Sequence, residues 1–143
     1  MKIHLLELKK KSQKKLPRLK KMAAVSPKEL GRSGEQLAAE FLIKKGYKLI
    51  TANLSFKQGE IDLLMSFEDT LVLVEVKTQQ SADFSDPILK IDYAKQRKLR
   101  LLSRIIASQY PDSNIQIDAV TLYWSSNNPE AAPIITHYPN ILT

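Results

Sequence analysis

The sequence predicts an α/β domain in which a mixed central sheet is flanked by helices, with elements in the order αβββαββ. Three observations support this fold class: an amphipathic helical pattern near the start, three consecutive strand patterns joined by short turns, and a second helical pattern followed by two further strands. The chain has 143 residues, of which 43% are hydrophobic and 26% charged. These values fit one ordinary globular domain, which we assign to residues 22–143.

The elements follow from hydrophobic spacing. From Pro27 onward the pattern is orderly, with apolar residues at helical spacing between Gly34 and Gly46, and Gly46 is a helix stop. A polar stretch, residues 78–87, precedes the second helix. The remaining elements are expected as strands over residues 47–56, 60–65 and 71–77, a helix over about 88–109, and strands over 115–122 and 134–138.

The N-terminal residues carry the whole excess of positive charge. The formal net charge is +7 and the pI is about 9.6, yet residues 1–21 hold nine Lys or Arg and a single acid, so the rest of the chain is close to neutral. The run KKKSQKKLPRLKK has little to bury, which is typical of a disordered basic arm. Met22 follows directly, so residues 1–21 also fit an over-extended start.

Composition restricts the chemistry that the domain can perform. The chain has no Cys and two His, at positions 4 and 137, which excludes disulfides, cysteine nucleophiles and thiolate zinc sites. A metal would need carboxylate ligands, which favours Mg²⁺ or Mn²⁺. The sequence has no stretch of membrane-spanning length, so we expect a cytoplasmic protein with no membrane partner.

The strand over residues 71–77 is the most informative segment. It is apolar enough to be central, yet it places Glu75 and Lys77 on one face near its end. A carboxylate between valines on a buried strand is costly to ionise unless a cation or hydrogen bonds compensate. A Glu-x-Lys motif alone is more often an exposed ion pair than a site.

The preceding strand favours a site. Asp62 lies between Ile61 and Leu63, and we expect a hairpin through residues 68–70 that can bring Asp62 beside Glu75. Two converging carboxylates can hold a divalent ion. Glu60 lies on the same face as Asp62 and is either a further acid near the site or an exposed residue.

Motifs distributed over residues 31–123 resemble the bacterial YraN-like family of the restriction-endonuclease-like superfamily, which is similar to Holliday-junction resolvases. The order and spacing of these motifs are more specific than Glu-x-Lys alone. They are Gly34-Glu35-x-x-Ala38, Gly46-Tyr47, Asn53, Gly59-Glu60-Ile61-Asp62-Leu63-Leu64, Val74-Glu75-Val76-Lys77-Thr78, Lys95 and Ile117-Asp118-Ala119-Val120.

The resemblance implies a PD-(D/E)xK core. Asp62 and Glu75 would be ligands of Mg²⁺ or Mn²⁺, Lys77 the catalytic lysine, and Glu35 a helix glutamate directed at the same metal. Without the resemblance, Glu35 is simply an acid that is favourable near a helix start. The sequence departs from the family pattern at three positions. Gln79 stands in place of an arginine, Ser85 stands in place of a glycine, and Gln116 departs from the Arg-Phe-Asp pattern that is usual before Asp118.

The second helix offers a candidate phosphate-binding face. Its basic residues Lys90, Arg97, Arg100 and Arg104 are spaced broadly along one side. The ordinary solvated face of an amphipathic helix explains them equally well.

Two functions of different classes are therefore expected. The first is a metal-dependent endonuclease-like protein that hydrolyses phosphodiester bonds in DNA, with branched or structured DNA as the expected substrate. The second is a non-catalytic nucleic-acid-binding or adaptor protein on the same fold. Resolvase-like relatives also imply a homodimer.

Overall fold

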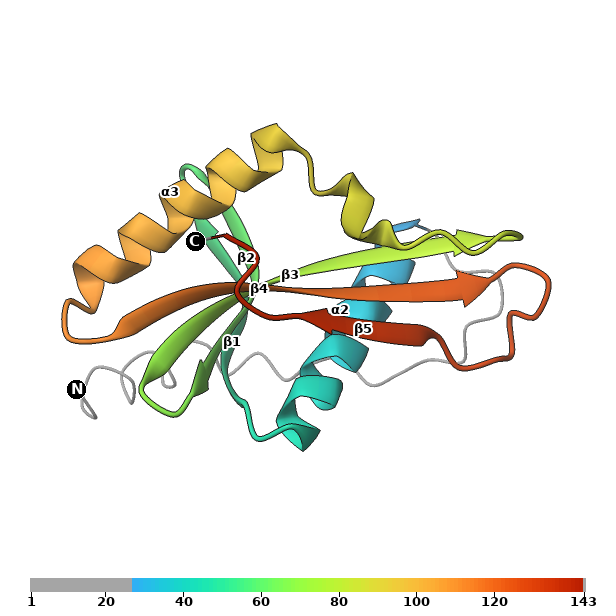
Figure 1. Cartoon of the computed structure of the whole chain (residues 1–143), viewed down its shortest axis with the longest axis horizontal. Coiled ribbons are helices and arrows are strands. Elements are labelled where there is room, and N and C mark those ends of the chain that lie inside the picture. Colours follow the sequence, from blue (N-terminus) through green and yellow to red (C-terminus); the bar gives the residue numbers. More distant parts are fainter. Residues whose placement is uncertain (1–26, 143) are drawn as a thin grey trace.

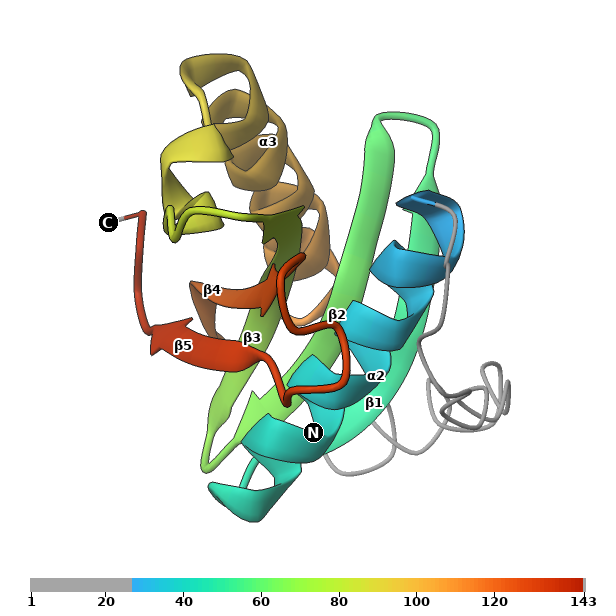
Figure 2. The ribbon, with the colours of Figure 1, turned by 90° about the vertical axis from the view of Figure 1, so that its right-hand side faces the viewer.

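The computed structural model describes residues 27–142, with side chains from residue 34 onward, and shows a five-stranded sheet with one long helix on each face (Figures 1 and 2). The predicted basic arm and the alternative start at Met22 lie outside the described residues. The elements are α2 (Pro27–Lys44), β1 (Lys48–Phe56), β2 (Gly59–Phe67), β3 (Thr70–Ser81), η1 (Pro87–Lys90), α3 (Tyr93–Gln109), β4 (Asn114–Ser125) and β5 (Ile134–Tyr138).

The sheet is mixed, as predicted. Its strands lie in sequence order, β1-β2-β3-β4-β5, and all neighbours are antiparallel except β3 and β4. The parallel pair requires a crossover, which η1 and α3 provide. The predicted order αβββαββ is confirmed, with the short 3-10 helix η1 as an addition.

The end of α2 explains Gly46. This residue has a φ of 98°, in the left-handed region that favours glycine. Its N–H donates to the Ile43 carbonyl at 3.0 Å, and the Tyr47 N–H donates to the Leu42 carbonyl at 3.1 Å. This pair of bonds is the Schellman motif, so the predicted helix stop is confirmed.

Two predicted boundaries are wrong. The second helical segment is not continuous over residues 88–109, because Asp92 accepts a hydrogen bond from the Lys95 N–H at 2.8 Å and caps a new helix. The third strand does not end at Lys77 but runs to Ser81, because β4 pairs with it in parallel as far as Ser81 and Ser125. Backbone pairing thus extends the strand into a stretch whose side chains are polar.

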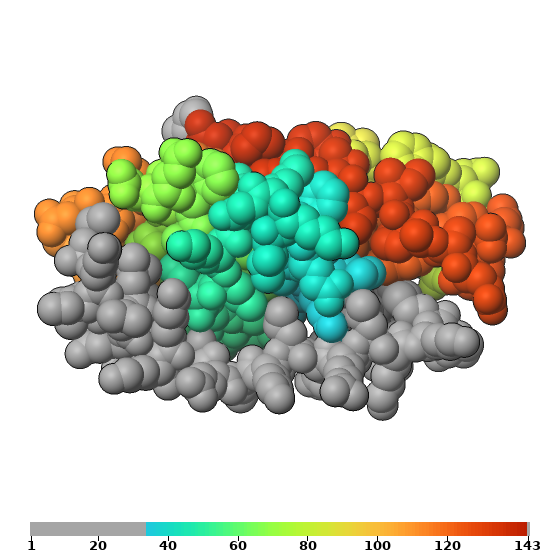
Figure 3. Space-filling model, turned by 90° about the horizontal axis from the view of Figure 1, so that it is seen from below, coloured from blue at the N-terminus to red at the C-terminus, as the bar shows by residue number. Residues whose placement is uncertain are grey.

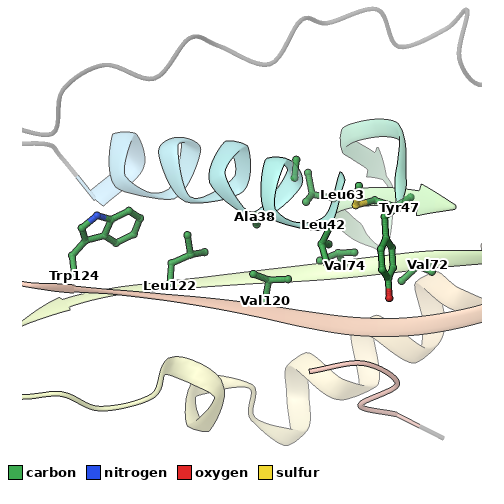
Figure 4. Packing of buried hydrophobic residues seen from close by; sticks show 11 residues of the cluster. Ala38, Leu42, Tyr47, Leu63, Val72, Val74, Val120, Leu122 and Trp124 are labelled. Carbon is green, nitrogen blue, oxygen red and sulfur yellow. The ribbon is translucent and has the colours of Figure 1, made fainter. Parts of the chain in front are cut away.

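Each face of the sheet has its own hydrophobic core. One core packs α2 against the sheet and includes Ala38, Leu42 and Trp124 (Figure 4). The other packs α3 through Leu99, Leu102 and Ile106. From below, α2 lies on the surface beside the β1–β2 hairpin (Figure 3). Within residues 27–142, no helix combines the length and the hydropathy needed to cross a membrane.

Candidate active site

The sheet forks where β2 and β3 separate. Their pairing runs from Phe67 and Thr70 to Leu63 and Val74 and then stops. Beyond that point β2 continues beside β1 alone and β3 beside β4 alone, and the β1–β2 hairpin diverges from β3 (Figure 2). Asp62 and Glu75 are the first residues past the last pair, so the fork brings the two predicted carboxylates together.

The Asp62 carboxylate accepts a backbone hydrogen bond at the fork. Its Oδ2 accepts a hydrogen bond from the Val76 N–H at 2.9 Å, which occupies a donor that faces β2 after the ladder has ended. Burial and then the neighbouring Glu75 charge raise the pKa of Asp62 to about 8, against lowering contributions from the Val76 bond and Lys95. Burial and the Glu75 charge therefore favour the protonated form of Asp62 when no cation is bound.

Glu75 is a buried carboxylate with an incomplete set of partners. The residue is 2% exposed, and its Oε1 lies 3.1 Å from Lys95 Nζ and 3.4 Å from Lys77 Nζ. Its Oε2 has no hydrogen-bond partner among the described residues. Buried polar atoms are nearly always paired in native proteins, so an unpartnered carboxylate oxygen beside a second carboxylate fits a cation ligand.

Glu35 reaches the neighbourhood of the fork from α2. A methyl group on Gly34 would overlap the Thr78 side chain on β3, so glycine lets this part of α2 approach the strand closely. The Glu35 charge contributes to the raised pKa of Asp62. No group of three His, Cys, Asp or Glu side chains is placed to hold a metal within residues 34–142, and Glu35 as a third ligand stays a prediction.

Two lysines, not one, neutralise Glu75. Lys77 extends from β3 as predicted, and Lys95 reaches the same oxygen from the first turn of α3. Both side chains are between a quarter and a third exposed, so both can face a ligand at the site. Lys95 is one of the YraN-like motif residues, but the sequence assigned it no role, because its contact with Glu75 depends on where α3 crosses the sheet.

Other candidate residues lie away from the carboxylate pair. Glu60 is exposed, and its carboxylate accepts a hydrogen bond from the Ser55 hydroxyl at 3.2 Å. Lys90 belongs to η1, so the expectation that it shares a helical face with the α3 residues is wrong. Arg97 and Arg104 are exposed on α3, while Arg100 is half-buried.

A second buried carboxylate lies at the other side of the sheet. Asp118 on β4 is fully buried, and its two oxygens have four hydrogen-bond partners. These are Tyr47 Oη at 3.3 Å, His137 Nε2 at 2.7 Å, Gln116 Nε2 at 2.7 Å and the Asn140 N–H at 2.9 Å. Burial, more than the Asp118 charge, raises the pKa of Tyr47 to about 12. Gln116 therefore belongs to this cluster and does not border the fork.

The fold and the fork together define a mixed α/β domain with a carboxylate and lysine cluster in its central sheet. The chain belongs to the Uncharacterised protein family UPF0102, and the model of this family matches residues 34–122. The matched range contains all the residues described at the fork, which are Glu35, Asp62, Glu75, Lys77 and Lys95.

Several relatives share most of their length with this chain. A UPF0102 protein of Clavibacter michiganensis subsp. michiganensis is 36% identical over 109 residues, covering 75% of this chain and 92% of its own. A UPF0102 protein of Caldanaerobacter subterraneus subsp. tengcongensis is 37% identical over 111 residues, covering 76% and 88%. One from Flavobacterium psychrophilum is 40% identical over 100 residues, covering 66% and 81%.

Proposed function

We propose that the protein is a metal-dependent endonuclease-like enzyme of the PD-(D/E)xK, restriction-endonuclease-like superfamily, which hydrolyses phosphodiester bonds in DNA. The observation that supports this most strongly is the unpartnered, buried Oε2 of Glu75 beside Asp62, with two lysines at the same point. The YraN-like motifs give the same assignment. Branched or structured DNA as the substrate and a homodimer as the assembly belong to the same proposal.

The residues divide the work of phosphodiester hydrolysis between them. Asp62 and Glu75 would hold Mg²⁺ or Mn²⁺, with Glu35 as a further carboxylate nearby. When bound, the ion supplies a Lewis acid that offsets negative charge on the phosphate. Lys77 presents an ammonium group beside the carboxylates, where it can orient the attacking water and stabilise charge on the phosphate. Lys95 holds Glu75 in place from α3.

A specific observation also favours the non-catalytic alternative. Gln79 stands on β3 where the YraN-like pattern has an arginine, and its amide donates to the Ser81 hydroxyl at 3.4 Å. It therefore brings no positive charge to the phosphate. A nucleic-acid-binding or adaptor protein would keep the fold and the basic residues of α3 without turnover.

Cleavage of a supercoiled plasmid and of a synthetic four-way junction in Mg²⁺ or Mn²⁺ tests the proposal. We expect Asp62→Ala and Lys77→Ala each to lower the cleavage rate by about 100-fold or more, since each removes a group that stabilises the transition state. Glu60→Ala is the matched control, because it removes an exposed carboxylate from the same strand. Cleavage that survives both substitutions would refute the proposal that this protein is the enzyme. Metal-independent binding without cleavage would favour the non-catalytic adaptor.

A further inference from the structure

Large apolar side chains are concentrated on a short exposed segment before and at the start of α3. Phe84 is 60% exposed, Leu89 84% and Tyr93 70%. We call residues 84–93 the apolar segment. Large apolar side chains exposed close together in the chain are candidates for an interaction site.

The backbone of the apolar segment is firmly held although these side chains are exposed. Asp86 accepts hydrogen bonds from the Ile88 N–H and from the Tyr138 hydroxyl on β5, and Pro87 and Ile91 are buried. The Phe84 ring packs edge-on against the Tyr123 ring, with centroids 4.9 Å apart. The exposed side chains are thus attached to a backbone that is held in place, which lowers the entropic cost of binding.

The charge around the apolar segment favours an anionic partner. Residues 87–109 hold six Lys or Arg and one acid, Asp92, whereas the rest of residues 27–142 holds seven basic and thirteen acidic residues. Arg97 follows Tyr93 by one helical turn, so the two side chains share a face. A second copy of this segment would bring like charges together. A polyanion with flat apolar faces matches both features, and unpaired nucleotides have this chemistry.

The apolar segment is also next to the fork. Tyr93 and Lys95 belong to the same first turn of α3, and Lys95 lies 3.1 Å from Glu75. Side chains two residues apart on a helix do not face each other, so a strand stacked on Tyr93 has to follow the first turn of α3 around to Lys95 to bring a phosphate near the carboxylate pair.

We infer that the apolar segment binds unpaired DNA bases, with Tyr93 as a stacking platform, Leu89 packing against the adjacent base, and Arg97 beside the backbone. This inference rests on the proposed function, because it makes the substrate a DNA with unpaired nucleotides next to the cleaved bond. Aromatic stacking accounts for recognition without reading a sequence.

Binding measurements with the full chain in EDTA test the inference without cleavage. Fluorescence anisotropy is recorded for a labelled dT oligonucleotide and for a blunt duplex of equal length. We expect Tyr93→Ala to weaken binding of the oligonucleotide by about 5- to 100-fold, since a stacked base contributes in that range. Tyr93→Phe keeps the ring and should stay within about twofold of the wild type. Duplex affinity should change little.

A control and a reporter make the result specific. Ile43→Ala is the matched control, because Ile43 is 46% exposed on α2, across the sheet from α3. In Tyr93→Trp the new indole is exposed while Trp124 is 3% exposed, so quenching by the oligonucleotide reports stacking at position 93.

Three results would overturn the inference. They are unchanged oligonucleotide affinity in Tyr93→Ala, an equal loss on duplex and single strand, and tighter, Tyr93-dependent binding of an rU oligonucleotide. Sedimentation that shows a wild-type dimer broken by Leu89→Ala would instead assign the surface to a second copy. Since these tests contain no metal, they are independent of whether Asp62 and Lys77 support cleavage.

Discussion

Asp62 and Asp118 are two acids in apolar strands of one sheet, and their surroundings differ in one decisive respect. Asp118 accepts four hydrogen bonds, from Tyr47 just before β1, from residues on β4 and β5, and from the C-terminal segment. Asp62 accepts one from the Val76 N–H and lies beside Glu75, whose Oε2 has no partner in the described part of the chain. The Asp118 cluster joins elements together, whereas the fork leaves coordination capacity open.

The difference separates a carboxylate whose charge the protein itself satisfies from one that we propose to be functional. A buried charge is stable where hydrogen bonds replace its lost hydration. At Asp118 the protein supplies these bonds itself. At the fork the protein supplies fewer bonds, and burial and the Glu75 charge raise the pKa of Asp62. A bound cation would relieve the repulsion between the two carboxylates.

The largest effect is expected on removing the satisfied carboxylate. Asp118→Ala should lower the free energy of unfolding by about 3–5 kcal/mol, because buried donors on Tyr47, His137 and Gln116 lose their acceptor. Urea unfolding followed by circular dichroism measures this loss. Asp118→Asn keeps the shape and should cost less, and a loss below about 1 kcal/mol in Asp118→Ala would contradict a structural role.

At the fork, removing the carboxylate charge should stabilise the protein instead of destabilising it. The folded-state pKa of Asp62 is about 8 against an ordinary value of 3.8, so its contribution to stability is present below about pH 4 and is lost as the pH rises through 8. Asp62→Asn cannot ionise and should raise the free energy of unfolding by on the order of 1–3 kcal/mol at pH 9 in EDTA. The gain should be smaller at pH 5. Exposed Glu60→Gln should show no such pH dependence.

Metal affinity should depend on pH at the fork. An ion held by Asp62 and Glu75 must displace the Asp62 proton, so Mn²⁺ affinity should rise about tenfold per pH unit between about pH 6 and 8 and then level off. Calorimetric titration at three pH values measures this change. Glu75→Gln should abolish the binding, and Tyr47→Phe should leave it unchanged. A flat profile would show that Asp62 is not a ligand.

The smallest effect is expected from one bond of the Asp118 cluster. Tyr47→Phe removes a hydroxyl that donates to Asp118 at 3.3 Å, while His137, Gln116 and Asn140 still satisfy the carboxylate. The free energy of unfolding should fall by about 0.5–1.5 kcal/mol. A loss as large as that of Asp118→Ala would mean that the other three donors cannot stabilise the Asp118 carboxylate without Tyr47.

Much of the fold and part of the candidate site were predictable from local patterns. Alternation along β3 placed Glu75 and Lys77 on one face, and the hairpin turn placed Asp62 beside Glu75, because both depend on the fixed period of a strand. Lys95 was not predictable as a partner of Glu75, since this contact depends on where α3 crosses the sheet. The break at Asp92 was also missed, because apolar spacing continues across a capping residue.

The sequence by itself determined the element order, the mixed sheet, the helix stop at Gly46 and the absence of cysteine chemistry. These depend on short-range backbone preferences and on composition. Only the tertiary structure decided which of two similar motifs, Ile61-Asp62-Leu63 or Ile117-Asp118-Ala119, leaves coordination capacity open. The physical reason is that the state of a buried carboxylate is set by partners from distant elements: β5 and the C-terminal segment complete Asp118, and the fork between β2 and β3 leaves Glu75 incomplete.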